Sequence, residues 1–185
     1  GKDTVGQTLA DKHGFLHVST SDMLRAAKKK AFGDGPEALL TRNDPFANEL
    51  RRTKGPGVLV ELAIQEQKSR KNEFPGGVVA SGIRSIGEAE AIHKAGGVII
   101  FVDADSMVRY NRTISRKRDA NEKQATYEDF MAMEQSERPD TNQDKTVQNL
   151  NAMKQMADIQ ILNNGNDMKA FMVEVEKILS KIFSN

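Results

Sequence analysis

Val98-Ile99-Ile100-Phe101-Val102 is apolar throughout, as a β-strand is when helices cover both faces of its sheet. Shorter apolar segments at 15–18, 77–81 and 158–162 predict three more strands, and longer segments with helical spacing of apolar residues separate them. Strands that alternate with helices in this way form parallel sheets covered by helices. The sequence therefore predicts an α/β protein with a three-layer α/β/α fold around a parallel sheet.

The pattern runs through residues 1–185 without a linker or an internal repeat, so we expect a single domain. Two parts depart from simple alternation. Glycines and prolines punctuate 33–57 before helical spacing resumes, which predicts a helical acceptor-binding lobe over 33–73. A polar stretch over 119–125 interrupts a helix, and we interpret 117–138 as a short lid.

Positive and negative side chains nearly balance, with 27 Lys and Arg against 26 Asp and Glu. A net charge of +1 gives no general attraction to nucleic acid or to a membrane surface, and we expect neither as a partner. No apolar run approaches the ~20 residues of a membrane-spanning helix. Because the first residues lack the apolar core of a secretory signal and Cys is absent, we expect a cytoplasmic protein.

Gly1-Lys2-Asp3-Thr4 stands at the start of a predicted helix over 2–12. The first turn of a helix presents N–H groups and the positive end of the helix dipole, so it favours phosphate, and a Lys there adds a mobile positive charge. These residues match the end of a phosphate-binding loop whose first Gly would precede them. We therefore expect five strands in the full protein, with the first strand absent here. The alternative is a solvated Lys at a chain start.

Val18-Ser19-Thr20-Ser21-Asp22-Met23-Leu24-Arg25 follows the first predicted helix and strand directly. Together with the first four residues, it resembles adenylate kinase and its nucleoside-monophosphate kinase relatives, which are P-loop kinases. The resemblance implies that Arg25 holds the phosphate of the acceptor, that Thr20 lies near the acceptor base, and that Asp22 belongs to the water shell of a magnesium ion. An Arg fork matches phosphate oxygens, and an acid beside bound phosphates needs a cation. Without the resemblance, Asp22 is a helix-capping acid and Arg25 a surface charge.

Asp3 occupies a position where this family usually has Ser or Thr, whose hydroxyl reaches magnesium. A carboxylate is a hard oxygen donor, so Asp3 could ligate the ion directly, and Thr4 could supply the hydroxyl instead. Gly1, Lys2, Asp3 and Thr4 are therefore predicted to bind ATP, with Asp3, Thr4 and Asp22 as the candidate metal-binding residues.

Ser81-Gly82-Ile83-Arg84 follows a predicted strand, at the edge of the sheet where open α/β proteins bind ligands. It resembles the acceptor-binding strand end of the same family, with Arg84 as a second phosphate-binding residue. The family's usual Asp is Ser81 here, and the Pro before the Arg is absent. Gly-Ile-Arg followed by Gly87-Glu88-Ala89-Glu90 is closer to dephospho-CoA kinases and archaeal adenylate-kinase-like proteins, which leaves the acceptor open.

Arg109, Arg112 and Arg116 lie at i, i+3 and i+7 and share one face of a predicted helix, with Met107 on the side that can pack into the core. Three guanidinium groups repel one another unless an anion lies against them, and polyphosphate is a natural candidate. The resemblance implies that Arg112 and Arg116 are the pair at the entry to a lid over ATP. We predict catalytic roles for both. The alternative is a solvated basic face that neighbouring Asp residues balance.

Asn163-Asn164-Gly165 follows the last predicted strand as a turn. It resembles the turn of dephospho-CoA kinase and its relatives at which the backbone approaches the adenine. The resemblance implies that Asn164 and Gly165 bind ATP. Taken alone, the segment indicates only a strand followed by a turn.

Together these residues predict a magnesium-dependent phosphotransferase that moves the γ-phosphoryl group of ATP to a nucleoside monophosphate or a similar nucleotide-like acceptor. Lys2 and Arg116 would stabilise the transferring charge, Arg112 would grip ATP, and Arg25 and Arg84 would position the acceptor. One alternative is a dephospho-CoA kinase, whose acceptor is a ribose hydroxyl and in which Asp22 could serve as the base and thus act catalytically. Another is a non-catalytic P-loop nucleotide-binding module. We expect a monomer or a small homo-oligomer.

Overall fold

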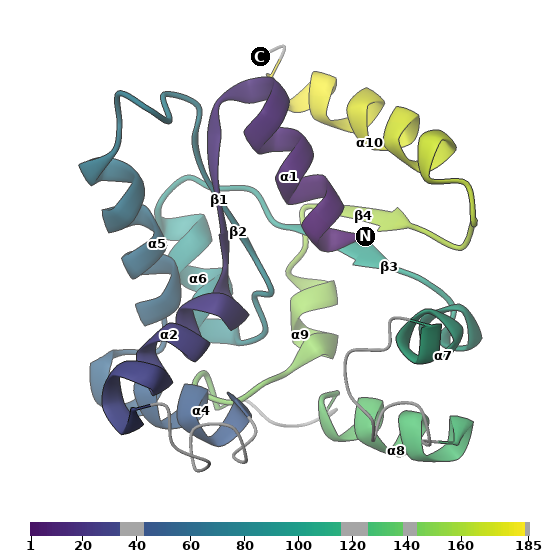
Figure 1. Ribbon diagram of the computed structural model, residues 1–185, viewed down its shortest axis with the longest axis horizontal. Helices are drawn as coiled ribbons and strands as arrows, with labels where there is room; N and C mark the ends of the chain where they lie inside the picture. The colour runs from purple at the N-terminus through teal and green to yellow at the C-terminus, as the bar shows by residue number, and fades with distance from the viewer. Residues whose placement is uncertain (34–42, 116–125, 139–143, 184–185) are drawn as a thin grey trace.

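The computed structural model describes residues 1–33, 43–115, 126–138 and 144–183. Within these ranges the chain is a mixed α/β structure in which helices outnumber strands (Figure 1). The elements in chain order are α1 (Lys2–His13), β1 (Phe15–Ser19), α2 (Thr20–Phe32), α4 (Asn43–Lys54), α5 (Val58–Ser69), β2 (Gly77–Ser81), α6 (Ile86–Lys94), β3 (Ile100–Asp103), α7 (Ser106–Ser115), α8 (Tyr127–Ser136), α9 (Leu150–Gln155), β4 (Ile159–Leu162) and α10 (Met168–Phe183).

The strands are parallel, as the sequence predicts, and they form two pairs. β1 pairs with β2 so that Phe15 lies opposite Gly77 and Ser19 opposite Ser81. β3 pairs with β4, and Asp103 lies opposite Leu162. Parallel strands joined through helices confirm the α/β fold class. In the described ranges no strand bridges β2 and β3, and the fifth strand stays a prediction.

β3 differs from its expected environment, because its four residues are all half-buried rather than covered on both faces. Within the described residues β3 is hydrogen-bonded along one edge only, to β4. A strand paired on one edge leaves part of each side chain within reach of solvent. Apolar composition alone therefore overstated how deeply this strand lies.

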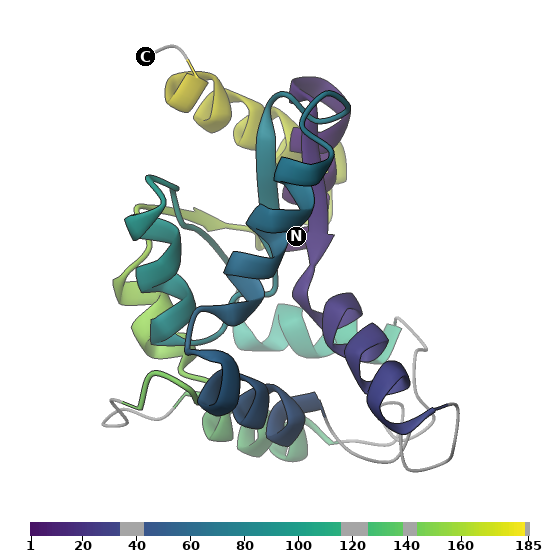
Figure 2. The same cartoon turned by 90° about the vertical axis from the view of Figure 1, so that its left-hand side faces the viewer.

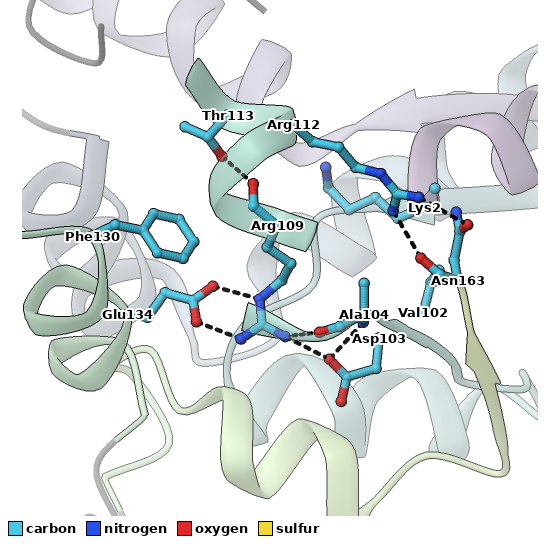
Figure 3. A pocket seen from close by; sticks show the side chains of 11 residues that line it. Lys2, Val102, Asp103, Ala104, Arg109, Arg112, Thr113, Phe130, Glu134 and Asn163 are labelled. Carbon is cyan, nitrogen blue, oxygen red and sulfur yellow. Dashed lines mark hydrogen bonds and ion pairs between the residues drawn. The ribbon is translucent and has the colours of Figure 1, made fainter. Parts of the chain in front are cut away.

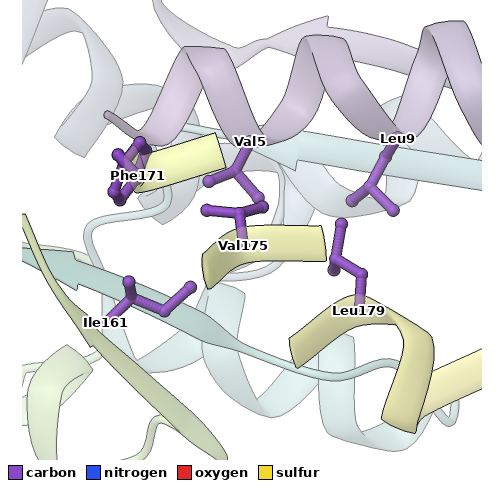
Figure 4. Close-up of a cluster of buried hydrophobic side chains, with 6 residues drawn as sticks. All are labelled: Val5, Leu9, Ile161, Phe171, Val175 and Leu179. Carbon is purple, nitrogen blue, oxygen red and sulfur yellow. The ribbon is translucent and has the colours of Figure 1, made fainter. Parts of the chain in front are cut away.

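α1 packs along α10, and this contact anchors the first residues of the chain (Figures 1 and 4). Val5 and Leu9 lie one turn apart on α1 and are buried. Gly14 ends the helix with φ 67°, a left-handed conformation that glycine adopts without strain. The apolar cluster between the two helices and β4 consists of Val5, Leu9, Ile161, Phe171, Val175 and Leu179.

α2 and α4 extend away from the end of the molecule where α10 lies (Figure 2). Leu24 of α2, Ala47 of α4, and Val58 and Leu59 of α5 share a second buried cluster. The described part of 33–73 is thus helical, while the extent of a separate lobe and of a lid over 117–138 stays a prediction. No helix in the described ranges is long and apolar enough to cross a membrane.

Candidate active site

The start of α1, the end of β3, α7, α8 and the end of β4 meet around a cavity of about 200 Å³ (Figure 3). Three residues that the sequence singles out for ATP, Gly1, Lys2 and Arg112, line it together. The complete lining is Gly1, Lys2, Val102, Asp103, Ala104, Arg109, Arg112, Thr113, Phe130, Glu134 and Asn163. The fold therefore brings the first two residues of the chain together with residues from its second half.

The first turn of α1 is suited to an anion. No side chain caps the helix at its N-terminal residue, Gly1, so the turn lacks the usual side-chain acceptor for its N–H groups. The Lys2 side chain is half-exposed, and its Nζ lies 3.1 Å from Oδ2 of Asp3. A flexible ammonium group at the positive end of a helix dipole attracts phosphate.

Arg112 connects α7 to the segment that follows β4. Its Nη1 donates to the carbonyl oxygen of Asn163 at 2.8 Å, and its Nη2 donates to the carbonyl oxygen of Gly165. Asn164 turns the other way and exchanges hydrogen bonds of 2.7 Å with Asp105 at the start of α7. The predicted ATP-binding residues Arg112 and Gly165 are thus in contact. Asn164 instead joins the segment after β4 to the start of α7.

Arg109 shares a face of α7 with Arg112, but its partners are carboxylates. Its Nε donates to Oε1 of Glu134 at 2.7 Å, its Nη2 to Oε2 of the same side chain, and its Nη1 lies 3.0 Å from Oδ1 of Asp103. These acids balance its charge without phosphate, so Arg109 acts as a structural link between β3, α7 and α8. Arg116, the third residue of the stripe, lies outside the described residues.

Asp103, the last residue of β3, is the centre of this network. Lys154 Nζ lies 2.7 Å from its Oδ2. Burial raises the pKa of the Asp103 carboxyl, but hydrogen bonds from Lys154 and the Ala104 N–H and the charge of Arg109 outweigh it and hold the pKa below its ordinary value. The carboxylate is therefore ionised and occupied, which suits a structural role at the pocket wall.

Asn163, Glu134 and Lys154 are site residues that the sequence did not single out. Asn163 is the first residue after β4, at the carboxyl end of a parallel strand where α/β proteins bind ligands. Its position directly after a predicted strand could have identified Asn163 as a site residue from the sequence. Glu134 and Lys154 act through tertiary contacts with residues far away in sequence, for which no local pattern exists.

Asp3 is held from two sides. Its Oδ1 accepts a hydrogen bond of 2.9 Å from the Ser81 hydroxyl at the end of β2. Nε2 of His17 lies 3.1 Å from the same hydroxyl oxygen, and because Ser81 gives its one proton to Asp3, His17 is the donor in that contact. Burial raises the pKa of Asp3, but the charge of Lys2 and the hydrogen bond from Ser81 outweigh it and hold the pKa below its ordinary value.

The residues predicted to bind the acceptor phosphate and base from α2, Arg25 and Thr20, have different partners. Arg25 forms an ion pair with Asp22 one turn earlier, and both side chains are exposed. Hydrogen bonding from Arg25 holds the pKa of Asp22 below its ordinary value. The Thr20 hydroxyl is buried and donates to the carbonyl oxygen of Gly82 at 2.9 Å, which fixes α2 to the end of β2.

Arg84 leaves the end of β2 and contacts α8 and the segment before α9. Its Nη1 lies 3.0 Å from Oε2 of Glu137 and donates to Oε1 of Gln148, also at 3.0 Å. The side chain remains one third exposed. Both predicted acceptor arginines are therefore paired with carboxylates, and neither lines the cavity that contains Lys2.

The candidate magnesium residues fit an ion that substrate phosphates hold in part. In the part of the chain that the structure describes, no group of three His, Cys, Asp or Glu side chains could hold a metal. Asp3 and Asp22 are ionised. The hydrogen bond from Arg25 has the largest effect on the pKa of Asp22, and the charge of Asp3 also acts on that pKa. Two nearby carboxylates suit magnesium, which usually binds one or two carboxylates together with phosphates and waters. Thr4 is partly buried near the start of α1, and its role as a magnesium ligand stays a prediction.

Comparison with known proteins points to nucleotide kinases. No protein-family model matches the chain. It is 34% identical over 93 residues to an adenylate kinase of Synechococcus sp. strain RCC307, covering 50% of this chain and 46% of that protein. It is 27% identical over 128 residues to an adenylate kinase of Synechococcus sp. strain CC9311, covering 64% of each. The chain thus spans about half to two thirds of the length of these curated relatives, and the resemblance to adenylate kinases is confirmed.

Among solved structures, dephospho-CoA kinase from Campylobacter jejuni aligns over 98% of this chain and 91% of its own, with a TM-score of 0.49 and 14% identity.

Proposed function

We propose that this chain, which is similar to adenylate kinases over half or more of its length, is an ATP-dependent nucleotide kinase. In this proposal the γ-phosphoryl group of ATP passes to a nucleoside monophosphate or a similar nucleotide-like acceptor. One observation carries the proposal: Lys2, at the start of α1, and Arg112 of α7 line the same cavity beside the segment after β4. Converging cations at a helix N-terminus form a site for a polyphosphate.

ATP would lie with its phosphates against the first turn of α1. The N–H groups of that turn and Lys2 Nζ would contact the phosphate oxygens, and Lys2 would follow the transferring group as its charge develops. Arg112 would hold the nucleotide near Asn164 and Gly165, whose backbone would approach the base. Arg116 would stabilise the transferring charge from the start of the lid.

The acceptor would bind at Arg25 and Arg84, with Thr20 close to its base. A phosphate dianion carries more charge than a carboxylate, so it would displace Asp22 and Glu137 from the two guanidinium groups. The Asp22 carboxylate that is released in this way would be available to magnesium. An acceptor that is already anionic, such as a monophosphate, needs no base.

Asp3, Thr4 and Asp22 would hold magnesium together with the phosphates of ATP. When bound, the ion would neutralise phosphate charge that develops during transfer. Ser81 and His17 hold the Asp3 carboxylate in place for this task through the hydrogen bonds described above. Closure of the 33–73 lobe and the 117–138 lid would exclude water, which otherwise competes as an acceptor.

An acceptor panel tests the proposal. The full-length protein is incubated with ATP and, separately, with AMP, GMP, CMP, UMP and dephospho-CoA, each with and without magnesium, and the formation of ADP and of the phosphorylated acceptor is measured. We expect transfer to one of the monophosphates that requires magnesium. Preference for dephospho-CoA would instead establish the alternative acceptor, and ATP binding without transfer to any acceptor would establish a non-catalytic module.

A further inference from the structure

Glu88 is a fully buried carboxylate at the start of α6, and none of the roles assigned so far uses it. Its exposed fraction is 0%, and that of Arg51, its ion-pair partner from α4, is 2%. A buried charge is strongly unfavourable unless hydrogen bonds satisfy it on all sides. The arrangement of those hydrogen bonds shows what the pair holds.

One carboxylate oxygen of Glu88 accepts hydrogen bonds from the backbone at Arg84. Oε2 accepts from the Arg84 N–H at 2.9 Å and from the Ser85 N–H at 3.2 Å. Ser85 returns the interaction, because its hydroxyl accepts from the Glu88 N–H in a capping box. The position of the Arg84 backbone is therefore set by the Glu88 side chain.

The other oxygen of the Glu88 carboxylate is held by Arg51 of α4. Oε1 accepts from Nε of Arg51 at 3.0 Å and from Nη2 of Arg51 at 2.9 Å. Nη1 of Arg51 also donates to Oδ1 of Asn48, on the same helix, at 3.2 Å. A single carboxylate thus spans from α4 to the segment between β2 and α6.

The surrounding packing leaves this segment little freedom. A Cβ built on Gly87 would lie 2.3 Å from Cβ of Pro56, so the turn between α4 and α5 touches the α6 backbone at a distance that admits no side chain. The Arg84 carbonyl accepts from the Asn149 N–H at 2.8 Å. Residues 84–88 are therefore held between α4 and the turn that follows it on one side and the segment before α9 on the other.

We propose that Glu88 and Arg51 are positioning residues that set Arg84 for the acceptor phosphate and couple its placement to the α4 lobe. The inference rests on the proposed function, in which Arg84 binds the acceptor. A phosphate-binding guanidinium acts only within a narrow range of positions, and a shift of about 1 Å at such a group costs large factors in rate. A carboxylate that bridges two elements fixes that position more firmly than separate contacts would.

Two variants test the bridge, and the second removes both buried charges together. Glu88→Asp keeps the charge but is one methylene shorter, so it cannot reach both Arg51 and the Arg84 N–H. Arg51→Met combined with Glu88→Gln removes both charges while the Gln oxygen can still accept from the backbone. Leu179→Ala, at the α1–α10 contact, serves as a control that lowers stability away from the acceptor side. Initial rates are measured with ATP and acceptor varied separately, and melting temperature is measured for each protein.

For Glu88→Asp we expect the acceptor KM to rise by about tenfold or more while the KM for ATP changes by less than about twofold. The double variant should show a smaller rise in the acceptor KM, and Leu179→Ala none despite a lower melting temperature. An unchanged acceptor KM in both Glu88 variants, with transfer by the wild type intact, would overturn the inference alone. Absence of transfer by the wild type to any acceptor would overturn the proposed function and this inference with it.

Discussion

The proposed donor pocket and the two arginines proposed to bind the acceptor, Arg25 and Arg84, are held in place by different kinds of interaction. Lys2 enters the pocket from α1, which apolar packing against α10 and β4 keeps in position. Arg25 and Arg84 are instead held by ion pairs with Asp22 and Glu137 on partly exposed surface. Apolar burial therefore holds the helix that carries Lys2, while exposed ion pairs hold the side chains of Arg25 and Arg84.

This difference suggests which side is ready before substrate binds. Apolar packing persists whatever ligand is present, whereas exposed ion pairs are weak and exchange readily with a stronger anion. We infer that the donor pocket is preformed and that the acceptor arginines change partners when a phosphate arrives. Variants that affect one side and spare the other can test the distinction.

The largest effect is expected from Leu9→Ala, which opens the α1–α10 contact. Leu9 is 5% exposed, and truncating a buried Leu typically costs about 3 kcal/mol of unfolding free energy. Leu62→Ala on α5, where the side chain is 42% exposed, is the matched control and should cost well under about 1 kcal/mol. Chemical denaturation measures both. Equal losses in the two variants would contradict the view that packing on α1 frames the donor side.

The next effect concerns chemistry rather than stability. Lys2→Met should lower kcat by about a hundredfold, near 2.7 kcal/mol of transition-state stabilisation, because no other described side chain at the α1 start is a mobile cation. Lys94→Met, at the end of α6 and away from the pocket, should leave kcat unchanged. Steady-state rates at saturating substrates decide the matter, and a kcat of Lys2→Met within about twofold of wild type would refute the role of Lys2.

A third, smaller effect depends on pH. The pKa of Asp103 lies below its ordinary value in the folded protein, so the unfolded chain takes up a proton first as the pH falls. The stability that ionised Asp103 contributes is therefore complete at neutral pH and is lost as the pH drops below about 4 through the folded pKa. Asp103→Asn should cost about 1–2 kcal/mol at pH 7, and the difference from wild type should shrink toward pH 3.

Denaturation curves from pH 7 to pH 3 measure this difference, with Asp11→Asn on the exposed side of α1 as a control. A difference that stays constant across this range would show that the Asp103 charge contributes nothing to the frame of the pocket.

Local patterns predicted the elements well and their environments poorly. β2 occupies 77–81, the range that its apolar run predicts. Met107, in contrast, falls on the side of α7 expected to face the core, yet it is 49% exposed. Helical spacing identifies a face of a helix but does not say which element covers it.

The candidate site was predictable where its chemistry is local. Gly1, Lys2 and Arg112 were recognised from residue type and spacing, and they do line one cavity. The partners of Arg109 were not predictable, because Glu134 lies 25 residues away on another helix. Nor does sequence reveal that Glu88 is buried against Arg51, since only the folded chain brings α4 and α6 together.

The division between donor and acceptor sides has a direct kinetic test. Arg112→Ala and Arg25→Ala are each assayed with ATP varied at fixed acceptor and with acceptor varied at fixed ATP. We predict that Arg112→Ala raises the KM for ATP by about tenfold and Arg25→Ala raises the acceptor KM by about tenfold, each leaving the other KM within about twofold. If Arg25→Ala instead raised the KM for ATP and spared the acceptor, the two sides would be interchanged and the account would be wrong.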